Sequence, residues 1–276
     1  MNYKILSDSS SNVRALEKVE FASVPLKIIC GEHEFVDDEN LDVPEMLSIL
    51  KASKERSSTS CPNTFDWLDN CENADCIFSV ALTSTLSGGY ASAVQANKIL
   101  VEEHPEKKFY AIHTLSTGPE NRLIVEKLES LIISGNDFET ICSEIDKYKE
   151  KTHLVFSLQS LDNFAKNGRI SPAVAKLAGL LGICIVGRAS SEGTLEPLHK
   201  VRGKIKALNT IYKAMTDEGF KGGKVRIAHC YNPEDANSLK EIITKDYPDC
   251  DISIELCGGL CNYYAEDQGI LVGFES

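Results

Sequence analysis

A strand, a polar turn and a helix follow one another in SVALTSTLSGGYASAVQANKIL, residues 79–100. The run before the turn is apolar and β-rich, and the segment after it has an apolar stripe at helical spacing. The turn itself holds four hydroxyls and two glycines within residues 83–89. Free backbone N–H groups at the start of a helix bind anions, so the turn predicts either an anion site or an ordinary serine N-cap.

The same alternation of strands and helices continues along the chain. Strands are expected at residues 3–7, 24–30, 76–82, 108–114, 152–158, 224–230 and 251–256. Helices are expected at residues 87–103, 119–133 and 201–220. The earlier strands are almost continuously apolar, as in a parallel sheet that is covered on both faces, so we expect an α/β fold.

The character of the sequence changes near residue 150. We expect residues 1–150 to form an α/β domain with a doubly wound, mainly parallel sheet and the hydroxyl-rich loops. Residues 151–276 are expected to form a second α/β domain with a mixed sheet, including a hairpin at 187–203 whose turn lies at 191–193. The apolar stripe of its helix is expected to consist of Val201, Ile205, Leu208, Tyr212 and Met215.

Composition excludes several classes of protein. The chain has 29 Lys and Arg against 41 Asp and Glu, and a net charge of −12 predicts repulsion from nucleic acid and anionic membranes. The longest apolar run has ten residues, 177–186, whereas a membrane-spanning helix needs about 20. No signal peptide is recognisable, so we expect a cytoplasmic protein whose ten cysteines are reduced and mostly buried.

The polar turn lacks the usual nucleotide and hydrolase motifs. No Walker A motif is present, and no G-x-G-x-x-G follows the first strand. The turn is not a G-x-S-x-G nucleophile elbow, because Thr85 stands where the first glycine should be. A serine hydrolase that pairs Ser87 with a strand-end histidine, His113 or His229, stays open as an alternative.

Three further hydroxyl clusters accompany this turn. They are DSSSN at 8–12, RSSTSCPNTFDW at 56–67 and HTLSTGPE at 113–120. Three of the four clusters directly follow expected strands, and in a doubly wound sheet the loops after the strands form the ligand crevice. Taken singly each cluster is only a turn, but together they predict a polar binding site.

A metal or thiol site is a further alternative. CGGLC at 257–261 and CENADC at 71–76 each bring two cysteines close together in sequence. Neither pair is matched by a second C-x-x-C or by a pair of histidines, so the spacing is weak evidence for zinc or an iron–sulfur cluster. The pair Cys257 and Cys261 would be its core.

Six motifs in order resemble the DegV family over nearly the whole chain. They are SDSSSN near the N-terminus, VPLKI with the acidic Asp37–Asp38, TSCP at 59–62, TSTLSGGY at 83–90, LDNFAKNGRIS at 161–171 and KVRG at 200–203. The resemblance implies a two-domain α/β protein with a long-chain fatty acid buried between the domains. It also implies a non-catalytic partner of a fatty acid kinase, which presents the carboxylate for phosphorylation, and no cofactor or metal.

The resemblance also implies the ligand contacts. By motif, Ser60 and Ser87 contact the carboxylate, and the loops around them suggest Thr59, Ser84, Gly88 and Ser116 as further ligand residues. The family's C-terminal His-x-Gly-Pro-Gly loop is absent from residues 257–274, so Tyr263 or Tyr264 is expected to replace its histidine. Arg169 and Arg202, kept from the family motifs, are candidates for docking an acidic partner such as a kinase or for neutralising phosphate, with surface salt bridges as the structural alternative.

Overall fold

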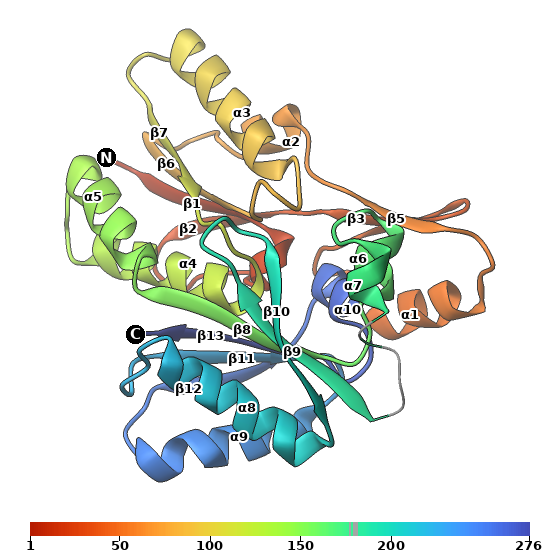
Figure 1. Cartoon of the computed structure of the whole chain (residues 1–276). Helices are drawn as coiled ribbons and strands as arrows, with labels where there is room; N and C mark the ends of the chain where they lie inside the picture. Colours follow the sequence, from red (N-terminus) through yellow and green to blue (C-terminus); the bar gives the residue numbers. More distant parts are fainter. Residues whose placement is uncertain (177, 179–181) are drawn as a thin grey trace.

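The computed structural model describes residues 1–176, 178 and 182–276, and its first sheet is entirely parallel (Figure 1). The strands are β1 (Tyr3–Asp8), β2 (Glu20–Val24), β6 (Cys76–Ala81) and β7 (Lys108–His113), in the order β2-β1-β6-β7. Adjacent residues of β1 point to opposite faces, so Ile5 packs with one group of helices and Leu6 with another. This confirms the doubly wound, parallel sheet.

Helices cover both faces of this sheet. On the side of Leu6 lie α2 (Thr64–Leu68) and α3 (Gly89–Glu103). On the side of Ile5 lie α4 (Gly118–Ile133) and α5 (Phe138–Lys149). Helix α3 begins where the polar turn ends, as the sequence predicts.

The second sheet is mixed and has the order β10-β9-β8-β13-β11-β12. Its strands are β8 (Thr152–Leu158), β9 (Ile183–Ala189), β10 (Leu195–Arg202), β11 (Val225–His229), β12 (Ile252–Leu256) and β13 (Ile270–Glu275). Strands β11 and β12 are parallel, and the other neighbours are antiparallel. Helices α8 (Lys204–Asp217) and α9 (Pro233–Asp246) cover one face. The mixed sheet and the hairpin β9–β10 are confirmed.

A small antiparallel sheet was not predicted. It has the order β4-β3-β5, with β3 (Lys27–Cys30), β4 (His33–Val36) and β5 (Ser57–Ser60). Helix α1 (Val43–Ala52) lies between β4 and β5 along the chain. The expected single strand at 24–30 is therefore wrong: Val24 ends β2, and β3 begins after Pro25, which has no N–H to donate to a ladder. The hydroxyl cluster at 57–60 is a strand rather than a loop.

The helix expected at 201–220 begins later than predicted. Val201 and Arg202 still belong to β10, and α8 starts only after Gly203, whose φ of +93° favours glycine. The expected core residue Ile205 is 77% exposed. The buried stripe consists of Ala207, Leu208, Ile211, Ala214 and Met215.

Several short elements complete the chain. They are η1 (Ser9–Ser11), α6 (Asp162–Lys166), α7 (Pro172–Ala175) and α10 (Gly259–Ala265). Of the apolar run 177–186, residues 177 and 179–181 lie outside the described residues, and 183–186 belong to β9. Across the part of the chain that the structure describes, no helix has the length and apolar character to cross a membrane. All ten cysteines are free, and seven of them are buried.

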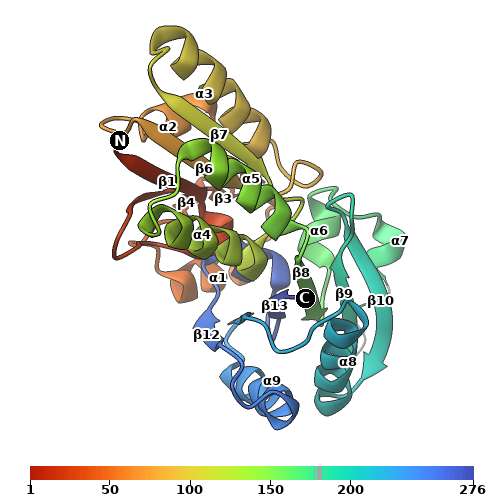
Figure 2. The ribbon, with the colours of Figure 1, turned by 90° about the vertical axis from the view of Figure 1, so that its left-hand side faces the viewer.

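Helix α4 contacts strands of both large sheets and lies between them (Figures 1 and 2). Its first turn packs directly on β13, where a Cβ at Gly273 would lie 2.4 Å from the carbonyl carbon of Pro119. The tip of the β9–β10 hairpin makes another link, because Thr83 Oγ1 donates to the carbonyl of Gly193 at 3.1 Å. The two sheets and the polar turn are thus held together by close packing and by hydrogen bonds.

Candidate functional site

A cavity of about 270 Å³ lies where the loops of the first sheet meet the open face of the second. Its apolar lining consists of Leu26, Leu82, Leu86, Leu154, Phe156, Leu158, Phe164, Leu195, Leu260, Ala265 and Leu271. These residues come from both halves of the chain. An apolar cavity with a few polar groups is typical of a site for a mainly apolar small molecule.

The polar turn forms one wall of this cavity. Asp8, fully buried at the end of β1, holds the turn in place, since its Oδ2 accepts from the Leu82 N–H at 2.6 Å. Ser87 and Gly88 line the cavity, and Ser87 Oγ accepts from the Gly89 N–H at 3.2 Å. Gly88, not Ser87, is the N-cap of α3. Within the described residues the Ser87 hydroxyl has no acceptor, so it can donate to a ligand.

Strand β5 contributes two more hydroxyls. Thr59 and Ser60 line the cavity, and Thr59 Oγ1 lies 2.7 Å from the hydroxyl of Tyr264 on α10. The Tyr264 ring stacks on Phe164 with 4.7 Å between centroids, and burial raises the pKa of its hydroxyl. Tyr264 is therefore a neutral group that lies against the hydroxyls of β5.

Arg169 is the cation of this wall. Its Nε donates to the carbonyl of Leu86 at 3.0 Å and its Nη1 to the carbonyl of Asn167 at 2.6 Å, so it is bonded to the polar turn. No carboxylate pairs with Arg169 among the described residues. The sequence suggested Arg169 for docking, for neutralising phosphate or for a surface salt bridge, because its spacing from the turn gives no sign of their contact. Arg202 is exposed on β10, away from the cavity lining.

Three predicted ligand residues lie outside the cavity. Ser84 is exposed, with its Oγ 2.9 Å from His113 Nε2, and the buried Ser116 donates to Glu120. Tyr263 accepts a hydrogen bond from Asn167 Nδ2 at 2.9 Å. Side chains that follow one another in a turn or helix point in different directions, so neighbours of a lining residue need not line the cavity. These three residues are therefore not part of the cavity lining from which the function is proposed below.

Glu266, two residues after Tyr264, is an acidic residue close in sequence to the cavity lining, but its carboxyl does not face the cavity and so does not repel an anion there. The residue has a φ of +55°, and its Oε1 accepts from the N–H of Asn163, at the start of α6, at 3.1 Å. Burial raises the pKa of this carboxyl. Its side chain lines a different depression from the cavity.

The geometry gives no support to a serine hydrolase. His113 Nε2 is engaged by Ser84, and His229 Nδ1 accepts from the Asn232 N–H at 3.2 Å. Among the described residues, neither histidine hydrogen-bonds Ser87, which a catalytic pair requires. The polar turn therefore lacks a general base for its serine.

The cysteine alternative gains no support either. Hydrogen bonds with Cys230 and Cys261, together with burial, raise the pKa of Cys257 well above its ordinary value. A metal ligand must be a thiolate, and the raised pKa disfavours the thiolate form of Cys257. In the described part of the chain no group of three or more His, Cys, Asp or Glu is arranged to hold a metal ion.

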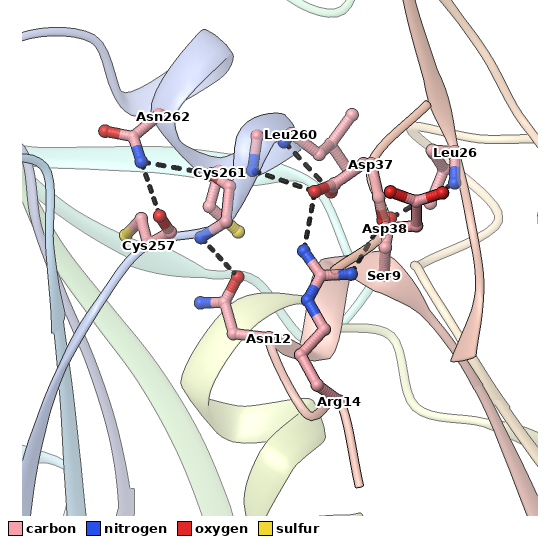
Figure 3. A network of polar contacts seen from close by, with 12 residues as sticks. Ser9, Asn12, Arg14, Leu26, Asp37, Asp38, Cys257, Leu260, Cys261 and Asn262 are labelled. Carbon is pink, nitrogen blue, oxygen red and sulfur yellow. Dashed lines mark hydrogen bonds and ion pairs between the residues drawn. The ribbon is translucent and has the colours of Figure 1, made fainter. Parts of the chain in front are cut away.

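A buried network positions α10 against the first half of the chain (Figure 3). Asp37 is fully buried and accepts from the backbone N–H groups of Gly259 at 2.9 Å and Leu260 at 3.0 Å. Arg14 Nη2 donates to Asp37 Oδ1 at 2.7 Å, and Asn12 Oδ1 accepts from the Gly258 N–H at 2.9 Å. A carboxylate at a helix N-terminus with an arginine beside it is charge-assisted on both sides.

This network matters for the cavity because α10 carries part of its lining. Leu260, Cys261 and Tyr264 all lie on this helix. In the sequence, Asp37 is recognisable only as the acidic residue after VPLKI. No sequence pattern indicates that it accepts hydrogen bonds from the backbone of α10, more than two hundred residues away.

Comparison with known proteins agrees with this architecture. A family model described as uncharacterised protein, DegV family, matches residues 2–274. The chain belongs to the DegV family. A DegV domain-containing protein of Streptococcus pneumoniae is 41% identical over 279 aligned residues, which cover 100% of this chain and 99% of the relative.

Two solved structures of DegV relatives are very similar. A DegV family protein from Eubacterium eligens, loaded with heptadecanoic acid, has a TM-score of 0.97 at 42% identity, over 99% of each chain. The fatty acid kinase (Fak) B3 protein of Streptococcus pneumoniae, loaded with linoleic acid, has a TM-score of 0.98 at 41% identity. That match covers 100% of this chain and 99% of the relative. Both are relatives of this DegV protein in fold and sequence.

Proposed function

We propose that this DegV family protein binds a long-chain fatty acid in the cavity between its two large sheets. The observation that carries the proposal is the make-up of the cavity, whose lining is mainly apolar with a few polar groups, among them Thr59, Ser60, Ser87, Thr117, Arg169 and Tyr264. Two separate contacts position these donors: Thr59 Oγ1 lies beside the Tyr264 hydroxyl, and Arg169 donates to the carbonyl of Leu86 in the turn that carries Ser87. The fatty acids in the two similar structures support the same ligand class.

The donors suit a carboxylate. In this proposal Ser87 and Ser60 donate their hydroxyl protons, the backbone at Gly88 adds a donor at the start of α3, and Arg169 supplies positive charge. Thr59 orients Tyr264, which takes the place of the family's histidine. The acyl chain of the fatty acid provides most of the affinity. At roughly 0.8 kcal/mol per buried CH₂, an acyl chain of sixteen carbons contributes on the order of 10 kcal/mol before ordering costs.

The protein performs no catalysis in this proposal. It acts as the binding subunit of a fatty acid kinase in the cytoplasm and presents the carboxylate to the catalytic partner, with Arg169 and Arg202 as docking residues. The similar Streptococcus pneumoniae protein is a fatty acid kinase (Fak) B3 protein, which supports this role. We retain the two-domain division, 1–150 and 151–276, as part of the proposal; β8 begins at Thr152, just past that boundary.

Replacing Ser87 by alanine tests the proposal. A hydrogen bond to a charged group contributes about 1.5–3 kcal/mol, so we expect Ser87→Ala to weaken binding of palmitic acid by about tenfold or more. Binding of the matching fatty alcohol, which has no charge, should change much less. The measurement is displacement of a fluorescent fatty acid from delipidated protein.

Ser84→Ala is the matched control, because Ser84 belongs to the same turn but is exposed outside the cavity. It should bind both palmitic acid and the alcohol like the unaltered protein. Equal affinity of the two variants for palmitic acid would contradict the placement of the carboxylate at Ser87.

A further inference from the structure

The side chains of β8 give the cavity a direction. Leu154, Phe156 and Leu158 all line it, because residues two apart in a strand share a face. At about 3.3 Å per residue, Leu154 lies roughly 13 Å along the strand from Leu158. The chain runs from Leu158 through α6 to Arg169 in the donor group. Leu154 is therefore the cavity-lining residue of β8 that lies farthest along the strand from the segment leading to Arg169.

Leu195 lies at the same end of the sheet as Leu154, two residues after Gly193, whose carbonyl accepts from Thr83 of the polar turn. In the second sheet Val155 pairs with Arg188, so Leu154 is level with Ala189, and Ala189 pairs with Leu195. Leu154 and Leu195 thus occupy one row across three strands. The opposite side of this end is closed by the first turn of α4, which packs on β13 at Gly273.

The same two leucines line a second cavity of about 910 Å³. Its other residues include five glutamates, Lys149, Arg188 and two histidines, so charged side chains border it. Glu120, which accepts from Thr152 Oγ1 at 2.9 Å, is one of the lining glutamates and is 5% exposed. Leu154 and Leu195 therefore separate an apolar cavity from one that charged side chains border.

We infer that Leu154 and Leu195 form the end wall of the acyl site and set the longest chain that binds well. This inference rests on the proposed function and adds to it a specificity determinant. A chain that reaches past the wall must displace a leucine and place its terminal methylenes against carboxyl groups and water. Those methylenes gain no hydrophobic burial, and the displaced leucine loses its own.

The test is the chain-length profile of Leu195→Ala. Saturated acids from decanoic to docosanoic acid are titrated against the delipidated full-length protein by displacement of a fluorescent fatty acid. For the unaltered protein we expect affinity to rise with length to a limit and then to fall by about tenfold or more. Leu195→Ala should move this limit to longer acids and leave shorter acids within about threefold of the unaltered protein.

Leu198→Ala is the matched control. Leu198 lies on the same strand and is also partly buried, but it packs on the opposite face of the sheet with α8 and α9. The longest acid that Leu198→Ala binds well should be the same as for the unaltered protein. Leu195→Phe gives a second readout, since a larger side chain at the wall should move the limit to shorter acids.

The outcomes separate the two proposals. If Leu195→Ala and Leu195→Phe keep the limit of the unaltered protein, the end wall is overturned while fatty-acid binding stands. If the unaltered protein binds none of the acids, the proposed function is overturned and the end wall with it.

Discussion

Asp37→Asn should lower the free energy of unfolding by about 3–5 kcal/mol, the usual cost of breaking a buried ion pair. Asp37 is fully buried and accepts from Gly259, Leu260 and Arg14 at 2.7–3.0 Å. Asparagine has no charge to offer Arg14 or the start of α10, and its amide group would place a donor among donors. Urea denaturation followed by circular dichroism measures the change.

Function should decline together with stability in this variant. Because α10 carries Leu260, Cys261 and Tyr264 of the cavity lining, its displacement should also weaken fatty-acid binding at temperatures where the variant is still folded. Asp38→Asn is the control: Asp38 is the next residue, is partly exposed and accepts locally from the Asn40 N–H at 2.8 Å. Equal stabilities of the two variants would contradict the role of Asp37 as the anchor of α10.

Glu120→Gln should make stability less dependent on pH. Glu120 is buried, and desolvation raises its pKa to about 7 although hydrogen bonds from Ser116 and Thr152 favour the charged form. The raised pKa stabilises the folded protein below about pH 4.5, and this stabilisation is lost as the pH rises to about 7. The shift corresponds to an effect on the order of 3 kcal/mol.

Glutamine can both donate and accept toward the two hydroxyls, so it keeps the packing and removes the titration. The variant should match the unaltered protein at pH 4 and exceed it in stability at pH 8, by thermal and urea unfolding. Burial also raises the pKa of Asp8, to about 6. Asp8 changes the stability of the unaltered protein and of Glu120→Gln equally with pH, so its contribution cancels when the two stabilities are subtracted. A stability difference that does not change between pH 4 and pH 8 would show that Glu120 does not titrate in the folded protein as argued.

The sequence predicted most strands of the two larger sheets, but not β2 or β13, for a physical reason. Strands such as β6 and β8 are short apolar runs that are buried on both faces, and their composition reflects that burial directly. The small sheet β4-β3-β5 escaped prediction because Ser57–Ser60 is polar and its strand character comes only from pairing with β3. The start of α8 was misplaced because Gly203, rather than the apolar spacing, determines where that helix begins.

The site was predicted in part for a similar reason. Ser87, Gly88, Ser60 and Thr59 lie in local motifs, and the structure brings them to one cavity. The apolar wall at Phe156 and the cation at Arg169 come from segments remote in sequence, whose meeting depends on tertiary packing. Pairings of this kind leave no pattern in a single sequence.

The most direct test of fatty-acid binding is the lipid content of the protein itself. Purified full-length protein is extracted with organic solvent, and the extract is quantified by mass spectrometry against the protein concentration. The cavity predicts about one long-chain fatty acid per chain, with less in Ser87→Ala purified in the same way. An extract without fatty acid, from protein that also fails to take up added fatty acid after delipidation, would contradict the proposed function.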